Sequence, residues 1–209
     1  MARLASVNVG RPAQVSVRRG RPLMSAIGKR PVDGRLRVAG VNVEGDDQAD
    51  RRVHGGPDKA VYAYASEDTA WWEEQLGREL GPGAFGENLT LEGVDVSGAV
   101  IGERWRVGHV LLEVCQPRFP CAKLGIRFGD RLMVRRFGEA SRPGAYFRIL
   151  EEGDLGAGDP VEIVHRPEHG ITIALVSQAV LLDESLRPLA ASAPELAADL
   201  ARALTARVA

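Results

Sequence analysis

The distribution of glycine along the chain limits the choice of fold more than any other feature of the sequence. All of the 24 glycines except Gly170 lie before His165. Between them recur short segments with β-branched or alternating apolar residues, which is the pattern of short strands joined by tight turns. The sequence therefore predicts a mainly β fold with helices, built as a barrel or a sandwich.

Short strands and two helices are expected in this glycine-rich part. The expected strands cover residues 4–9, 14–17, 35–43, 60–64, 88–91, 104–107, 110–114, 145–150 and 160–164. A bulge is expected in the third of them, at Ala39-Gly40. Ser66 is positioned to cap a helix that ends near Leu76, and a second helix is expected near residues 130–137.

After His165 the composition becomes rich in alanine and leucine. Helices are expected at residues 174–182 and 184–190. Ser192 and Glu195 have the spacing of a capping box, which would open a third helix with one apolar stripe. This end of the chain therefore predicts three short helices.

The length of 209 residues suffices for one ordinary domain with a small addition. We expect a β domain at residues 1–165 and a three-helix appendage at residues 166–209. Such an appendage is too small to be stable unless it packs on the β domain.

The net charge and the cysteine content limit which partners and which cellular compartment are expected. The net charge of −1 gives no general attraction to nucleic acid or to an anionic membrane, so neither is expected as a partner. The N-terminus lacks the apolar region of a signal peptide, and no apolar run approaches the ~20 residues that span a bilayer. Two cysteines make no disulfide framework, which favours a reducing, cytoplasmic setting.

Lysine is scarce among the basic residues. Lys29, Lys59 and Lys123 stand against 24 arginines. A lysine offers a compact point charge where an arginine offers a planar fork, so the two are not interchangeable at a tight site. We hypothesise that the three ammonium groups converge on one anion; the alternative is that three lysines remain by chance.

Both cysteines lie in one stiff segment, residues 113–124. Arg118 and Lys123 flank Cys121, and positive charge beside a thiol favours the thiolate that attacks electrophiles or ligates metals. A zinc site is disfavoured because there is no C-x₂-C pair and the histidines are scattered. A cysteine hydrolase would need a histidine base, such as His54, near the thiol. Cys115 ends an apolar strand, where an inert role is expected.

Two polar segments add candidate ligands. Arg52, His54 and Lys59 are suited to phosphate or carboxylate, although the aspartates of residues 46–58 could pair with them instead. Asn88 follows a glycine turn and could clamp a ligand. Taken alone, a turn in which this amide bonds the local backbone is the better interpretation.

These segments, in this order, resemble the MOSC domain, which is named from the C-terminal domain of molybdenum-cofactor sulfurases. The matching pieces are Gly45-Asp-Asp-Gln-Ala-Asp50, His54-Gly-Gly-Pro-Asp-Lys-Ala60, Gly86-Glu-Asn-Leu89, Gln116-Pro-Arg118, Pro120-Cys121 and Lys123-Leu124. The closest likeness is to the YiiM-like branch. The resemblance implies a MOSC-type β-barrel followed by a small three-helix C-terminal domain. Cys115 stands where this branch commonly has serine.

The resemblance also implies a molybdenum cofactor and a reaction. Cys121 would be the catalytic thiolate and the protein ligand of the molybdenum. The residues that would bind the cofactor are Lys29, Arg52, His54, Lys59, Asn88, Arg118 and Lys123. The implied activity is reduction of N-hydroxylated bases, such as 6-hydroxylaminopurine, to amines, with electrons from a separate flavin or iron–sulfur reductase. The alternatives are a non-catalytic carrier of the cofactor or of sulfur, and a metal-free cysteine hydrolase.

Overall fold

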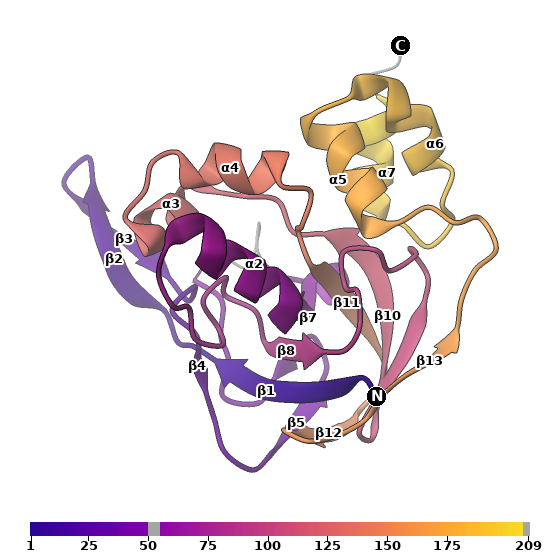
Figure 1. Ribbon diagram of the computed structural model, residues 1–209, viewed down its shortest axis with the longest axis horizontal. Coiled ribbons are helices and arrows are strands. Elements are labelled where there is room, and N and C mark those ends of the chain that lie inside the picture. The colour runs from indigo at the N-terminus through magenta and orange to yellow at the C-terminus, as the bar shows by residue number, and fades with distance from the viewer. Residues whose placement is uncertain (50–54, 207–209) are drawn as a thin grey trace.

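The computed structural model describes residues 1–49 and 55–206, and a large mixed sheet organises them (Figure 1). The order of its eight strands is β13-β9-β10-β11-β7-β8-β1-β4. Their bounds are β1 (Arg3–Val9), β4 (Arg30–Pro31), β7 (Val61–Ala65), β8 (Leu89–Glu92), β9 (Arg104–Val107), β10 (Val110–Pro117), β11 (Ala145–Glu151) and β13 (Val161–His165). Strand β9 lies where the sequence predicted it, and most other expected strands shift by one to three residues.

One pair of strands is parallel and places a helix over the sheet. Strands β7 and β8 run parallel, while the other neighbours in the sheet are antiparallel. A parallel pair needs a crossover connection, and helix α2 (Ser66–Leu76) lies in it and contacts both strands. This helix ends at Leu76 as expected, but the predicted cap is wrong: Ala65 occupies the N-cap position without a side-chain cap, and Ser66 is the first helical residue.

The expected closed barrel is not found among the described residues, because the strand order ends at β13 and β4. The two ends of the sheet do approach each other. Backbone hydrogen bonds join Leu4 N to Asp159 O and Gly158 N to Leu4 O, both at 2.8 Å, and Arg3 forms an isolated bridge with Pro160. Proline has no N–H to donate, so a regular ladder is interrupted at this position.

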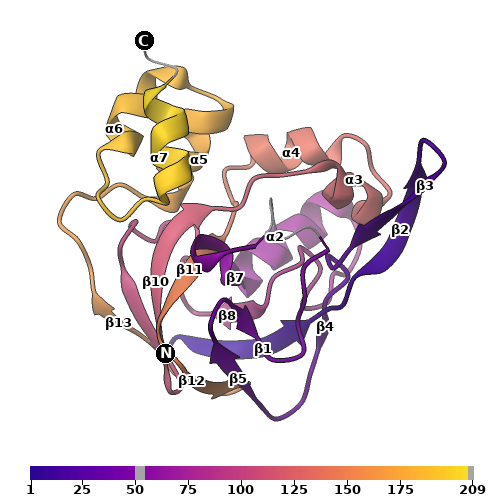
Figure 2. The same ribbon diagram turned by 180° about the vertical axis from the view of Figure 1, so that it is seen from behind.

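Two smaller sheets flank the large one. Strands β12 (Gly153–Gly156), β5 (Arg35–Ala39) and β6 (Asn42–Val43) form one of them. The single bulged strand expected at residues 35–43 is therefore wrong: the chain turns at Gly40, whose φ is 62°, and pairs Val38 with Val43. Strands β2 (Ala13–Arg18) and β3 (Arg21–Ser25) form the other sheet, a hairpin that projects from the body (Figure 2).

Helices α2, α3 (Ala122–Phe128) and α4 (Met133–Glu139) enclose an aromatic cluster. The rings of Trp72 and Phe137 stack with 8° between their planes, and Tyr64 stacks on Phe85 with 4.5 Å between centroids. Trp72 Nε1 donates to the Tyr64 hydroxyl over 3.0 Å, so the buried polar tips are satisfied. Helix α3 was not predicted, and α4 starts three residues later than expected.

The C-terminal helices pack on the sheet and share its core. They are α5 (Ile173–Leu181), α6 (Arg187–Ala191) and α7 (Ala198–Thr205), and the 3₁₀ turn η2 (Glu184–Leu186) lies between α5 and α6. A second 3₁₀ turn, η1 (Pro57–Lys59), lies far from them in the chain, just before β7. Ile173 N donates to Ala99 O over 2.9 Å, and Ala197 N donates to Cys115 O over 3.0 Å. The division at residue 165 stays a prediction. In the described ranges, no helix is long and apolar enough to cross a membrane.

The capping box expected at Ser192 is wrong. Helix α7 starts at Ala198, and Ala197 occupies its N-cap position without a side-chain cap. The backbone carbonyl of Glu195 instead accepts a hydrogen bond from Arg148 on β11. Contact with the sheet therefore overrides the local capping signal.

Two glycines with a positive φ allow the cost of backbone strain to be compared with the cost of steric overlap. Gly144 has φ 64°, and a Cβ there would lie 2.5 Å from Ala63 O; Gly77 has φ 62°, with nothing within 4 Å of such a Cβ. We expect Gly77→Ala to cost about 1 kcal/mol from strain alone. Gly144→Ala should cost about 1–3 kcal/mol more because its methyl overlaps β7. Thermal unfolding checks this, at about 2–4 °C per kcal/mol; equal shifts in melting temperature would contradict it.

Candidate functional site

Six of the eight site residues predicted from the sequence line one pocket. They are Lys29, Lys59, Asn88, Arg118, Cys121 and Lys123. The other two, Arg52 and His54, lie outside the described residues. The three lysines, which are far apart in sequence, are thus brought to the same pocket.

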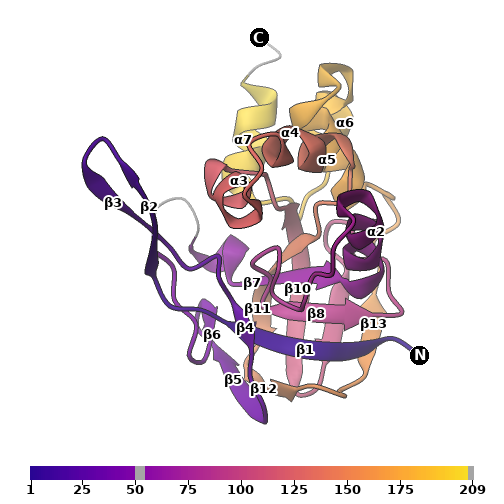
Figure 3. The same cartoon turned by 60° about the vertical axis from the view of Figure 1, so that its left-hand side comes forward.

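The elements of the sheet explain this convergence. Arg118 directly follows β10, and Cys121 occupies the N-cap position of α3. Lys59 ends the 3₁₀ turn η1, which leads into β7. Lys29 lies between β3 and β4 (Figure 3). The pocket therefore forms where these connections meet, at the ends of strands.

Arg118 is a buried cation with unused hydrogen-bonding capacity. Its side chain lies 5.1 Å from the ring centroid of Phe137 and 6.0 Å from that of Tyr62, which places the guanidinium against aromatic faces. Within the described part of the chain, its Nη1 atom has no hydrogen-bond partner. An unsatisfied buried donor costs free energy, so this atom marks a position for an acceptor from a ligand.

The charge of Lys29 is already balanced inside the protein. Its buried ammonium bonds both carboxylate oxygens of Asp46. Burial lowers the pKa of Lys29, and the Asp46 carboxylate opposes this shift. Asp46 also accepts from Gly10 N over 2.8 Å and from Asn88 Nδ2 over 2.9 Å. Lys29 therefore lines the pocket as half of an ion pair, a partner that the sequence did not indicate for this residue.

Asn88 uses its amide to join strands. Its Oδ1 accepts from Tyr62 N over 3.2 Å, and its Nδ2 donates to Asn8 O over 3.3 Å as well as to Asp46. Next to it, the buried carboxylate of Glu87 accepts from Gly83 N and Phe85 N, and burial raises the pKa of Glu87. The segment that resembled a polar clamp thus holds the wall of the pocket in place.

The two cysteines lie in different environments. Cys115 is buried, and its Sγ donates to Asp58 O over 3.0 Å and to Tyr146 O over 3.3 Å. Burial raises the pKa of the Cys115 thiol well above its ordinary value, which keeps it neutral. Cys121 is partly exposed and lines the pocket. Only the second thiol is placed to meet a ligand.

The described histidines lie away from this thiol. His109 pairs with Asp154 at 3.1 Å, and His169 lies 3.5 Å from Glu195. None of the described histidines lines the pocket of Cys121. Over residues 1–49 and 55–206, no group of three or more His, Cys, Asp or Glu residues could hold a metal ion. Neither a histidine base nor an all-protein metal site is therefore found in the described part.

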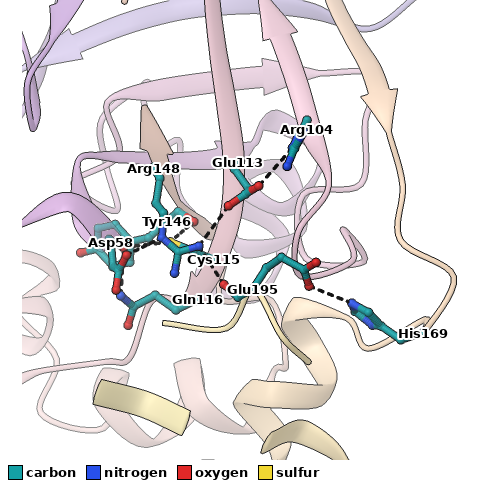
Figure 4. A network of polar contacts seen from close by, with 9 residues as sticks. All are labelled: Asp58, Arg104, Glu113, Cys115, Gln116, Tyr146, Arg148, His169 and Glu195. Carbon is teal, nitrogen blue, oxygen red and sulfur yellow. Dashed lines mark hydrogen bonds and ion pairs between the residues drawn. The ribbon is translucent and has the colours of Figure 1, made fainter. Parts of the chain in front are cut away.

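Arg148 belongs to Gly144-Ala-Tyr-Phe-Arg148, a further piece of the family resemblance, but no site role was predicted for it, yet it fixes the turn that carries Lys59 (Figure 4). Its Nε bonds Asp58, the residue before Lys59. Its Nη1 donates to Glu113 Oε1 over 3.1 Å and to Glu195 O over 2.9 Å. One side chain of β11 thus joins η1, β10 and the C-terminal segment. A partly buried arginine within a strand was the signal available in the sequence, but its partners are distant in the chain.

Comparison with known proteins places the chain in a family. Residues 50–162 match the MOSC domain. The chain belongs to the MOSC domain family. The resemblance noted in the sequence is thereby confirmed.

Three relatives show how far the likeness extends. The uncharacterized protein YflK of Bacillus subtilis is 40% identical over 173 residues, which are 83% of this chain and 78% of that protein. A protein named reductase from Gibberella moniliformis is 34% identical over 152 residues, 71% of this chain but 27% of that longer protein. The crystal structure of YiiM from Geobacillus stearothermophilus has a TM-score of 0.82 and 30% identity over the full length of both chains. The whole fold, including the C-terminal helices, is therefore YiiM-like.

The environments of the two thiols predict different reactivity. A disulfide reagent such as Ellman's reagent should modify one thiol per folded chain quickly, and the second only after unfolding, because Cys115 is buried and neutral. Cys115→Ser should retain the fast reaction and Cys121→Ser should lose it. Absorbance of the released thiolate measures both. A fast reaction in folded Cys121→Ser would contradict the assignment.

Proposed function

We propose that this MOSC protein is a molybdenum-cofactor-dependent reductase of N-hydroxylated compounds. The observation that carries the proposal is the single pocket shared by the accessible Cys121 thiol and the unsatisfied Arg118 guanidinium. The similarity to a fungal protein named reductase supports reduction as the type of reaction. The finer choice of substrate, an N-hydroxylated base such as 6-hydroxylaminopurine, comes from the family resemblance.

The residues of the pocket fit the chemical groups of this cofactor. The cofactor carries a terminal phosphate and a sulfur-ligated metal. A soft thiolate such as that of Cys121 suits a thiophilic metal. The unsatisfied Nη1 of Arg118 can donate to a phosphate or to a pterin oxygen, and Lys123 adds a second cation in the same pocket. Because the described protein residues offer no cluster of metal ligands, the remaining ligands would come from the dithiolene of the pterin.

The reaction needs two electrons and two protons. An N-hydroxylated compound, R–NH–OH, accepts them and yields R–NH₂ and water. When bound, the cofactor would supply a metal centre able to pass two electrons to the N–O bond. The electrons originate in an external flavin or iron–sulfur protein, the donor expected from the resemblance.

Tyr146 is placed to deliver one of the protons. It lines the pocket beside Cys121, and desolvation raises the pKa of its hydroxyl, so the group stays protonated at neutral pH. A protonated hydroxyl at the N–O bond would let the departing oxygen leave as water. Tyr62 and Phe85 add aromatic walls to the same pocket. These side chains orient the substrate and hold the proton.

The first experiment measures retained molybdenum and pterin. In purified wild-type protein produced in cells that make the cofactor, we expect about one molybdenum per chain by mass spectrometry and pterin fluorescence after oxidation. Cys121→Ala should lose the metal and the reduction of 6-hydroxylaminopurine. Cys115→Ser, the matched control, should keep both. Full activity of Cys121→Ala with an artificial electron donor would rule out this mechanism.

The same experiment separates reduction from a carrier role. A non-catalytic carrier of the cofactor or of sulfur would retain molybdenum but leave 6-hydroxylaminopurine unchanged. A metal-free cysteine hydrolase would retain neither molybdenum nor pterin. Wild-type protein that behaves in either way would replace the reductase proposal with that alternative.

Removal of the unsatisfied guanidinium tests how the cofactor is held. Arg118→Met keeps the packing against Phe137 but removes the donors, so we expect roughly tenfold weaker retention of pterin and molybdenum after dialysis. Thermal unfolding should change little, because Nη1 makes no hydrogen bond within the described part of the protein that could be lost. Arg148→Met, the matched control from the Figure 4 network, should instead lower the melting temperature. Undiminished pterin content in Arg118→Met would contradict this role.

A further inference from the structure

The start of the chain has a charge distribution unlike that of the remainder. The first 32 residues contain seven basic residues and no acidic one, whereas the rest contains 20 basic and 28 acidic residues. The seven are Arg3, Arg11, Arg18, Arg19, Arg21, Lys29 and Arg30. Arg3 pairs with Glu92 and Lys29 pairs with Asp46, so the positive charge that the net charge of −1 conceals is carried by the other five.

Much of this charge lies on the projecting β2–β3 hairpin, which stands apart from the large sheet in three views (Figures 1, 2 and 3). Its turn consists of Arg19, with φ 52°, and Gly20, with φ 73°. Two consecutive left-handed residues form the tight turn whose twist matches that of paired strands. The hairpin is therefore an ordered arm, and β2 contacts α3 of the body.

The end of the arm places like charges against each other. Arg18 and Arg21 are directly opposite in the register of β2 and β3, and both are exposed. Like charges in directly opposed positions destabilise a pair of strands. Across the described residues, neither arginine has an ion-pair or hydrogen-bond partner. Carboxylates of a second molecule would relieve this repulsion.

An apolar strip lies on the face of the hairpin opposite to that of Arg18 and Arg21. Val17 is 59% exposed and lies opposite Pro22, while Met24, two residues further along the same face, is 40% exposed. Protein interfaces combine arginine and methionine with apolar contact, whereas a phosphate backbone uses only the cations. A partner that meets both faces of the arm would use apolar contacts as well as charge, which favours an acidic protein over a nucleic acid.

The arm is continuous with the wall of the pocket. Ser25, the last residue of β3, lines the same pocket as Cys121, as do Ala26 and Ile27. Arg21 and Ser25 are four residues apart, about 13 Å along an extended strand. A protein that binds the arm would thus lie beside the site that needs electrons.

We propose that the β2–β3 hairpin is a docking arm for an acidic electron-transfer protein that carries a flavin or an iron–sulfur cluster. This inference rests on the proposed function, in which each N–OH group consumes two electrons. The two electrons come one at a time from two reduced iron–sulfur proteins that dock in succession, or together from one flavin hydroquinone. With two protons, one of them delivered by Tyr146 and replaced from solvent, the N–O bond breaks and water leaves.

The direct test is a binding titration. Arg18→Glu combined with Arg21→Glu reverses the charge of the arm while retaining the cross-strand like-charge pair. Arg37→Glu combined with Arg202→Glu, on exposed positions of β5 and α7, is the control with the same change in net charge. An acidic plant-type [2Fe–2S] ferredoxin is the probe, followed by calorimetry at low and physiological salt. We expect at least about tenfold weaker binding for the arm variant at low salt and a small effect for the control.

Activity assays separate the arm from the chemistry. With reduced methyl viologen, a small donor that needs no docking, the arm variant should reduce 6-hydroxylaminopurine at the wild-type rate. With reduced ferredoxin, it should be at least about tenfold slower. If wild-type protein is inactive with both donors, the proposed function is wrong, and the titration alone still decides the role of the arm.

Three outcomes would overturn the docking proposal. One is equal ferredoxin binding by the wild type and the arm variant. Another is arm-dependent binding of duplex DNA or anionic vesicles without binding of ferredoxin. The third is a dimer in sedimentation that dissociates in the arm variant, which would make a second copy of this chain the occupant.

Discussion

The arrangement of the pocket depends on the hydrogen bonds that the Arg148 guanidinium donates. This guanidinium joins η1 through Asp58, β10 through Glu113, and the segment before α7 through the carbonyl of Glu195 (Figure 4). Bonds between ionised partners are stronger than neutral ones and restrict geometry. Because η1 has only three residues and no side-chain cap, its position depends on such outside contacts. The C-terminal helices therefore help to place the turn that ends in Lys59, besides covering the sheet.

Close approach of Gly83 and Gly86 to residues 27–29 shapes another wall of the pocket. A Cβ on Gly86 would lie 2.9 Å from Ile27 Cγ1, and one on Gly83 would lie 2.7 Å from Lys29 O. Glycine is required at both positions, since each also has a positive φ. The approach brings Lys29 within reach of Asp46, so that burial of the ammonium is matched by a carboxylate. Two of the glycines whose pattern indicated short strands thus also shape the pocket.

The sequence predicted those parts of the site that are local in the chain. Cys121 and Lys123 follow one strand and its proline-containing turn, so their proximity needs no tertiary information. The strand β3 and helix α3 were missed, because Pro22 and Gly125 are poor local signals for a strand and a helix. The partners of Lys29 and Arg148 could not be assigned, since they lie 17 to 90 residues away and depend on the register of the sheet.

The basic side chains occupy three environments that composition cannot distinguish. Lys29 is neutralised inside the protein by Asp46. Arg118 is buried with an unsatisfied donor, so it is poised for a ligand. Arg18 and Arg21 are exposed in a cross-strand pair, where only solvent or a second molecule can offset their repulsion. A net charge of −1 indicated no general attraction to nucleic acid or to an anionic membrane, but local attraction depends on where charges lie and whether they are already paired. The segment from β2 to Lys29 runs from solvent to the pocket. The arginines at its exposed end are unpaired, whereas Lys29 at its buried end is paired with Asp46.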